Sequence, residues 1–236
     1  MATLGEMATG VAHELNQPLS VIQMISNLFA RKLDLGALPD KKTFSDVSAK
    51  LRSNVERASK IINHMREFGR KSALEVSSLQ INDVILRALD FFGQQLRLRN
   101  IEVVLELEHA VPIIKADPNR LEQVFINLLT NARDAIEEKS LKQPLTQDDK
   151  RITIRTHFNR RYVFAEVCDT GTGIPKELTH KIFEPFFTTK TVGKGTGLGL
   201  SISYNIISDY GGTIHAVSKE GEGACFDIRF PRATGA

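Results

Sequence analysis

Two long stripes of apolar positions open the chain and predict a pair of helices. Between residues 4 and 33 the apolar side chains recur every three or four positions, and a polar turn around Pro39 separates this stretch from a second stripe over 43–70. The second stripe has near-heptad spacing. Two long helices joined by a short loop form an antiparallel hairpin. Because such a hairpin has too little apolar partner surface by itself, we expect two copies to pair into a four-helix bundle, that is, a homodimer.

The rest of the chain mixes strand and helix patterns and predicts a second domain. Asp117 is placed to cap one of its helices, and Pro118 fits the first turn. Since strands and helices do not alternate strictly, we expect an α+β protein in which an α/β sandwich follows the hairpin, rather than a doubly wound parallel sheet. The predicted domains are 1–72 and 79–236, with a linker over 73–78. The predicted helices are 80–93, 118–138 and 199–210, the strands are 101–107, 151–158, 161–168, 212–218 and 224–230, and a polar loop covers 140–150.

Composition narrows the class of protein. With 236 residues, 42% hydrophobic and 25% charged, the chain resembles an ordinary soluble globular protein. The net charge of +3 is too small for a dedicated nucleic-acid binder. The sequence has no apolar run of the roughly 18 residues needed to span a bilayer, and it opens with no signal-peptide pattern. Cys168 and Cys225 stand far apart with no CxxC motif, which favours a reduced, cytosolic setting.

The first candidate for chemistry is His13 in the first predicted helix. Helical geometry places it off the apolar stripe, where an imidazole is a usable nucleophile near neutral pH. Glu14 follows it, but Gln17 stands where a zinc protease of the HExxH type needs its second histidine, so that interpretation fails. Pro18 is expected to kink the helix at this point. Taken alone, the pattern also fits a surface histidine with no further role.

Two polar features of the second domain point to a nucleotide. Asn127, Asn131 and Asp134 share one face of a predicted helix, where amide oxygens could hold Mg²⁺ between the protein and phosphates. Asp169 opens the sequence Asp-Thr-Gly-Thr-Gly directly after an apolar strand. Its carboxylate can accept a hydrogen bond from the exocyclic amine of adenine, and the glycines allow close approach to the backbone. A solvated helix face and an ordinary turn are the alternatives.

A second glycine-rich stretch, 193–199, runs directly into a predicted helix. Glycine-rich backbone ahead of a helix N-terminus can cradle phosphates. The stretch is not a Walker A motif, because Gly195 follows Lys194 where Ser or Thr belongs, and it is not GxGxxG, because the last position is Leu200. A flexible linker is the alternative. Between the glycine stretches lie three phenylalanines that fit either a lid hinge or ordinary core: Phe183, Phe186 and Phe187.

Taken in order over residues 4–232, these motifs resemble the two-component sensor histidine kinases. That family joins a helical dimerisation and phosphotransfer domain to a Bergerat-type ATP-binding domain, so the resemblance implies ATP and Mg²⁺ as cofactors. It implies that His13 accepts the phosphoryl group, that Glu14 accepts a hydrogen bond from its ring, and that Gln17 could orient a water. The nucleotide-binding residues that it implies, with Asn131 as the Mg²⁺ ligand, are Asn127, Asn131, Asp134, Asp169, Gly171, Gly173, Phe183, Phe187, Lys190, Gly195, Thr196, Gly197, Leu198 and Gly199.

The resemblance implies ATP-dependent autophosphorylation of His13 and transfer of the phosphoryl group to an Asp of a response-regulator receiver domain. A hydrolytic ATPase of the gyrase or mismatch-repair type is the first rival. It carries a Glu base four residues before the metal-binding Asn, where this chain has Asn127. A scaffold with a degenerate pocket is the second rival, and intact Asn131 and Asp169 argue against it. We expect a cytoplasmic protein without nucleic-acid partners, attached to a membrane, if at all, only through an upstream region.

Overall fold

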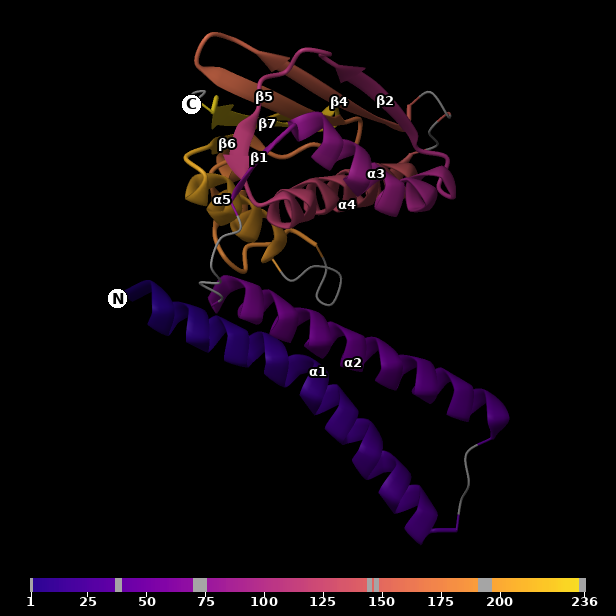
Figure 1. Cartoon of the computed structure of the whole chain (residues 1–236). Coiled ribbons are helices and arrows are strands. Elements are labelled where there is room, and N and C mark those ends of the chain that lie inside the picture. The colour runs from indigo at the N-terminus through magenta and orange to yellow at the C-terminus, as the bar shows by residue number, and fades with distance from the viewer. Residues whose placement is uncertain are drawn as a thin grey trace. The chain divides into compact units, whose positions relative to one another are not determined.

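The computed structural model describes residues 2–36, 40–69, 76–143, 146, 149–190 and 197–233 (Figure 1). The chain divides into two compact units, whose main parts are the segment up to residue 72 and the segment from residue 73 onwards. The first is a helical hairpin and the second is a mixed α/β domain. The predicted fold class is confirmed, and the two units are described in turn.

The hairpin consists of two long helices, α1 (Ala2–Asp34) and α2 (Lys41–Gly69). α2 begins two residues earlier than predicted because Asp40 caps it: one carboxylate oxygen accepts the backbone N–H of Thr43 at 2.7 Å and the other accepts its hydroxyl at 3.1 Å. These bonds lower the pKa of Asp40. Pro18 lies inside α1, where it removes one helical hydrogen bond, and Figure 1 shows α1 bending along its length. Pro39 of the predicted turn lies outside the described residues.

Many of the described apolar side chains of the hairpin are exposed. Among its described hydrophobic side chains only Ile25 and Ala58 are buried. One edge-to-face contact, between Phe29 and Phe44 with centroids 6.2 Å apart, joins the helices near the turn. The exposed large apolar side chains on the two helices are Leu19, Met24, Leu28, Phe44, Val55 and Ile62. In the described part of the hairpin, the two helices therefore leave several large apolar side chains uncovered by each other.

The second unit has a five-stranded sheet in the order β2-β4-β5-β7-β6, with β2 parallel to β4 and the other neighbours antiparallel. Helices α3, α4 and α5 lie together on one face of this sheet (Figure 1). A small antiparallel pair, β1 with β3, stands apart from it. The elements are β1 (Ser77–Leu79), α3 (Ile81–Arg97), β2 (Glu102–Leu107), β3 (Ile114–Ala116), α4 (Pro118–Lys142), β4 (Arg151–Phe158), β5 (Tyr162–Asp169), α5 (Gly199–Asp209), β6 (Thr213–Lys219) and β7 (Gly223–Pro231), with short 3₁₀ turns at Lys176–Leu178 and Lys181–Phe183.

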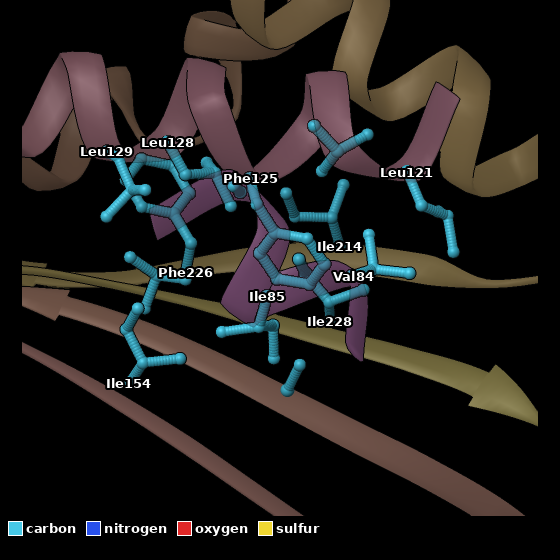
Figure 2. Close-up of a cluster of buried hydrophobic side chains, with 14 of the residues drawn as sticks. Val84, Ile85, Leu121, Phe125, Leu128, Leu129, Ile154, Ile214, Phe226 and Ile228 are labelled. Carbon is cyan, nitrogen blue, oxygen red and sulfur yellow. The ribbon is translucent and has the colours of Figure 1, made fainter. Parts of the chain in front are cut away.

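The core of this unit lies between the sheet and helices α3 and α4. Along β5 and β7 every second side chain is buried, which is the period of a strand with one covered face. Figure 2 shows the apolar side chains of α4, among them Phe125, Leu128 and Leu129, directed at Ile154 and Phe226 of the sheet. Asp117 caps α4 as predicted, since its side chain accepts the N–H groups of the second and third residues after it. α4 is thereby a fixed, well-packed support.

The structure differs from the sequence analysis at several points. The last two residues of the predicted linker, 73–78, belong to β1, and the three-residue strands β1 and β3 were not predicted. α4 continues through Lys142 into the predicted loop, helped by Lys139 and Lys142 in its last turn, whose positive charge suits the helix C-terminus. Cys168 and Cys225 are joined as a disulfide instead of standing as free thiols. Among the described residues, no helix combines the length and apolar character needed to cross a membrane.

Gly93 offers a test of local helix energetics. It lies inside α3, and a Cβ at this position would meet no atom within 4 Å. Because glycine costs a helix interior about 0.5–1 kcal/mol relative to alanine, Gly93→Ala should raise the free energy of unfolding by about that amount. Urea unfolding followed by circular dichroism measures it. An unchanged or lower value would contradict this account of α3.

Candidate functional site

His13 lies in the first half of α1, as predicted. The side chains of His13 and Glu14 lie outside the described residues, so their predicted roles stay predictions. Gln17, one turn further along, has a half-buried side chain. Of the other described residues predicted for the site, Lys190 groups with the first unit and the remainder belong to the second.

Asp169 ends β5 with its carboxylate largely buried. Its Oδ1 accepts the backbone N–H of Gly171 at 2.8 Å and that of Ala224, on β7, at 3.4 Å. Burial raises the pKa of Asp169 to about 6, although the two N–H groups and the charge of Lys139 act in the opposite direction. Lys139 donates to the carbonyl oxygen of Thr170 at 2.8 Å. A buried carboxylate with a strongly shifted pKa is typical of a functional site.

Gly171 brings the loop after β5 against α4. A Cβ on this residue would lie 2.5 Å from the Cβ of Ala135 and 2.8 Å from Oδ1 of Asp169, so only glycine fits without a shift. Gly173 has φ +70°, and a Cβ there would strike the backbone carbonyl of Lys219. The loop is held to the β6–β7 turn by the N–H of Gly221, which donates to the carbonyl of Thr172 at 2.7 Å.

The second glycine segment meets α4 at the other end of the same helix face. The side-chain amide of Asn127 donates to the carbonyl of Gly199 at 3.3 Å and to the hydroxyl of Ser203 at 3.4 Å. The hydroxyl of Ser203 in turn donates to the carbonyl of Gly199 at 3.0 Å. Leu198 precedes α5 and provides no side-chain cap. The first turn of α5 is therefore held by Asn127. The backbone N–H groups at the start of α5 receive no side-chain cap from Leu198.

Asn131 lies midway between these two contacts. It is four residues after Asn127 and four before Ala135, so the three share one face of α4. Asp134, also predicted for the site, accepts two hydrogen bonds from Arg133, at 2.9 and 2.6 Å. The guanidinium of Arg133 also lies over the ring of Phe92, 5.3 Å from its centroid. The carboxylate of Asp134 therefore already pairs with the guanidinium of Arg133, in addition to any role in nucleotide binding.

The phenylalanines lie between the two glycine segments as half-buried residues packed against the core. The ring of Phe183 contacts that of Tyr204 on α5, with centroids 5.8 Å apart. The backbone of Phe186, at φ +66°, lies so close to Gly197 that a Cβ there would collide with it. Lys190 is half-buried, whereas Gly195 and Thr196 lie outside the described residues. Of the described predicted residues, Asn127 and Asn131 lie on α4, Gly171 and Gly199 lie against its face, and Asp169 bonds to Gly171.

Three contributors to the site were not predicted from the sequence. Ala224 holds Asp169 from the neighbouring strand, Ser203 holds the start of α5, and Gly223, at φ +111°, lies against the backbone of Asp169. Gly223 could have been identified from the sequence, because a glycine in a strand often marks a place where another backbone approaches closely. Ala224 and Ser203 have no such signal, since their roles depend on the strand order and on helix packing.

Comparison with known proteins adds to this geometry. Residues 116–234 match the family described as Histidine kinase-, DNA gyrase B-, and HSP90-like ATPase, and residues 3–74 match the His Kinase A (phospho-acceptor) domain. The chain is similar to the two-component sensor PprA of Pseudomonas aeruginosa, with 39% identity over 236 residues, and to the sensor kinase CckA of Brucella abortus, with 38% identity over 239 residues. These alignments cover 99% and 98% of this chain but 25% and 24% of those proteins. The chain thus spans about a quarter of their length.

Among solved structures, the chain is similar to histidine kinase ThkA, crystallised in complex with response regulator protein TrrA. The TM-score is 0.75 and the sequence identity is 30%, over 98% of this chain and 63% of that one. The similarity therefore includes both the hairpin and the mixed α/β domain.

Proposed function

We propose, from the premise that this chain belongs to the two-component sensor histidine kinases, that it transfers the γ-phosphoryl group of ATP to His13 and then to an Asp of a response regulator. The family membership rests on the two matched domains and on the relatives. The activity is our proposal for this chain. The observation that carries it is the common support of Asp169, Asn131 and both glycine segments along one face of α4.

We place the nucleotide along this face of α4, with adenine at one end and the phosphates at the other. Adenine takes the end at Asp169, whose carboxylate only accepts hydrogen bonds and so suits the exocyclic amine. The phosphates take the end at α5, where the N–H groups of the first turn and the helix dipole favour negative charge. Asn131 lies between, with an amide oxygen of the kind that Mg²⁺ binds. When bound, Mg²⁺ would neutralise charge on the phosphates. Gly197 lies just ahead of α5, and Gly195 and Thr196 are assigned to nucleotide binding from the sequence motif alone.

The chemistry at His13 is a nucleophilic displacement. One ring nitrogen attacks the γ-phosphorus in line, the bond to the bridging oxygen breaks, and ADP leaves. Glu14 accepts a hydrogen bond from the other ring nitrogen, which holds the reactive tautomer and stabilises the positive charge that develops on the ring. The carboxylate of the regulator's Asp then attacks the phosphorus and releases the histidine. Gln17, on the same face one turn later, is positioned by its spacing to orient a water that hydrolyses the regulator's aspartyl phosphate, releasing inorganic phosphate and the free carboxylate.

The assembly is a homodimer through the hairpin. The uncovered apolar side chains of α1 and α2 require a partner surface, and a second hairpin supplies a matching one in a four-helix bundle. Within each chain we assign residues 1–72 to dimerisation and phosphotransfer, 73–78 to the linker and 79–236 to ATP binding. The response-regulator partner is supported by the complex known for ThkA. We place this part of the protein in the cytoplasm, where ATP and the regulator are found.

Incubation with γ-labelled ATP and Mg²⁺ tests the proposal. We expect protein-bound label that is lost in acid, survives base, and moves to an added receiver domain, while His13→Ala takes up none and still binds ATP. Free phosphate without protein-bound label would identify an ATPase instead, and the absence of both would identify a scaffold. Profiling transfer against a panel of receiver domains would then find the cognate regulator.

A further inference from the structure

We propose that Cys168 and Cys225 form a reversible redox modification site, and that their disulfide strengthens nucleotide binding; this inference rests on the proposed function. A small-molecule disulfide of the glutathione class is the oxidant. Neither cysteine takes part in the proposed phosphoryl transfer.

The two cysteines face each other across β5 and β7. They are 57 residues apart in sequence, but they form the last register pair of this ladder, with their Cα atoms 3.9 Å apart and their sulfurs joined. Their strand neighbours Val167 and Phe226 are buried under the helices, so the cysteines point to the opposite face of the sheet. Both side chains are only half-buried there, which leaves them open to small solutes.

The pair adjoins the nucleotide site through the backbone of both strands. Asp169 follows Cys168 directly, and Ala224, whose N–H donates to Asp169, directly precedes Cys225. Gly223 packs so closely on the carbonyl of Asp169 that no side chain fits between them. The carboxylate proposed to bind adenine is thus held by the strand ends that the two cysteines join.

The proposed cytoplasmic location implies that this disulfide forms and breaks reversibly. In a cytosol, disulfides are rare, and those that form are usually transient and serve catalysis or redox sensing. One protein thiolate attacks the small disulfide, forms a mixed disulfide and releases one thiol; the second protein thiolate then displaces the other thiol. In total, the two protein thiols lose two electrons and two protons. The small disulfide takes up both and becomes two thiols.

The disulfide should raise nucleotide affinity by preorganisation. In the dithiol form no covalent link joins the last pair of the β5–β7 ladder, and only the pairing with each other and with β4 and β6 holds these strand ends. Opening of this pair separates Ala224 from Asp169. The covalent bond prevents this, so less ordering is needed when adenine binds. We expect ATP to bind about threefold to tenfold more tightly to the disulfide form than to the dithiol form.

The experiment uses the full chain in two states, reduced with dithiothreitol or treated with glutathione disulfide. Mass spectrometry after thiol alkylation counts the free thiols, and calorimetry with ATP and Mg²⁺ gives the affinity. The double variant Cys168→Ser/Cys225→Ser is the matched control and should bind ATP with equal affinity after either treatment, because it has no thiol left to form a mixed disulfide. Before each titration the protein is passed through a chelating resin, because both sulfurs and a carboxylate oxygen of Glu166 lie within 4.8 Å of one another and could hold a metal.

The outcomes separate this inference from the proposed function. Equal ATP affinity in the two states, with the disulfide verified by mass, would overturn the inference and leave the kinase proposal intact. Failure of glutathione disulfide to oxidise the pair would also overturn it. A lack of ATP binding in both states would instead reject the proposed function and, with it, the role given to the disulfide.

Discussion

Replacing Asp169 with asparagine is expected to remove most nucleotide affinity and yet make the protein more stable. Oδ1 of Asp169 is already committed to the N–H groups of Gly171 and Ala224, and an asparagine oxygen can keep both bonds. The second position then holds an amide N–H₂ in place of a carboxylate oxygen. Since two donors cannot bond to each other, the adenine amine loses its acceptor, and ATP should bind about 100-fold more weakly.

The gain in stability follows from the raised pKa of Asp169. Burial moves that pKa from 3.8 to about 6 in the folded protein. Between these values the folded state holds a proton that the unfolded state has released, so stability falls as pH rises toward 6 and stays lower above it. The ionised carboxylate therefore costs on the order of 2–3 kcal/mol at pH 7. Asp169→Asn removes this cost because its side chain carries no charge.

Two measurements check this prediction. Urea unfolding of wild type and Asp169→Asn from pH 4 to pH 8 should show a stability difference that is largest near pH 7–8 and nearly gone at pH 4. Calorimetry should show that wild-type ATP affinity weakens as pH falls through about 6, while the weak affinity of the variant does not change there. A variant that is less stable at pH 7 would show that the buried charge of Asp169 does not destabilise the fold. A variant that binds ATP normally would show that this carboxylate does not bind adenine.

Gly171→Ala should damage both stability and nucleotide binding. The new Cβ would lie 2.5 Å from the Cβ of Ala135 and 2.7 Å from its backbone carbon, and neither atom can rotate away because α4 is well packed. The loop after β5 must therefore move, and the N–H of Gly171 leaves Asp169. Overpacking of this kind costs roughly 1–3 kcal/mol, and we expect ATP affinity to fall at least about tenfold.

Gly199→Ala is the matched control for Gly171→Ala. Gly199 also lies against α4, but its Cβ would meet the side chain of Asn127 at 3.7 Å, an ordinary contact. Its free energy of unfolding should stay within about 0.5 kcal/mol of wild type. Thermal and urea unfolding of the two variants, with calorimetry on Gly171→Ala, make the comparison. Equal stability of both variants would refute the close packing described for Gly171.

The sequence predicted the elements whose signal is local. Continuous apolar stripes located α1 and α2, and Asp117 with Pro118 located the start of α4. It missed β1 and β3, three residues each, because they exist only by pairing with each other across more than 30 residues of chain. The start of α2 differed because Asp40, interpreted as a turn residue, is a helix cap.

The candidate site divides in the same way. Asp169, Asn131 and the glycines could be predicted, since each belongs to a short motif with a physical reason. Their meeting along α4 could not be deduced from spacing, because it requires the strand order and the packing of loops on the helix. The cysteine pair illustrates this: Cys168 and Cys225 become partners only through the register of β5 with β7.

The way both glycine segments rest on α4 has an evolutionary consequence. Their contacts, at Asn127 and Ala135, are eight residues apart, so helical rise separates them by roughly 12 Å. In the proposed binding mode, the distance from base to phosphate is therefore set by the length of α4 between these two contacts. A single residue gained or lost in the middle of α4 would put the two contacts out of phase, so we expect the length of this helix segment to vary little among relatives that bind the same nucleotide.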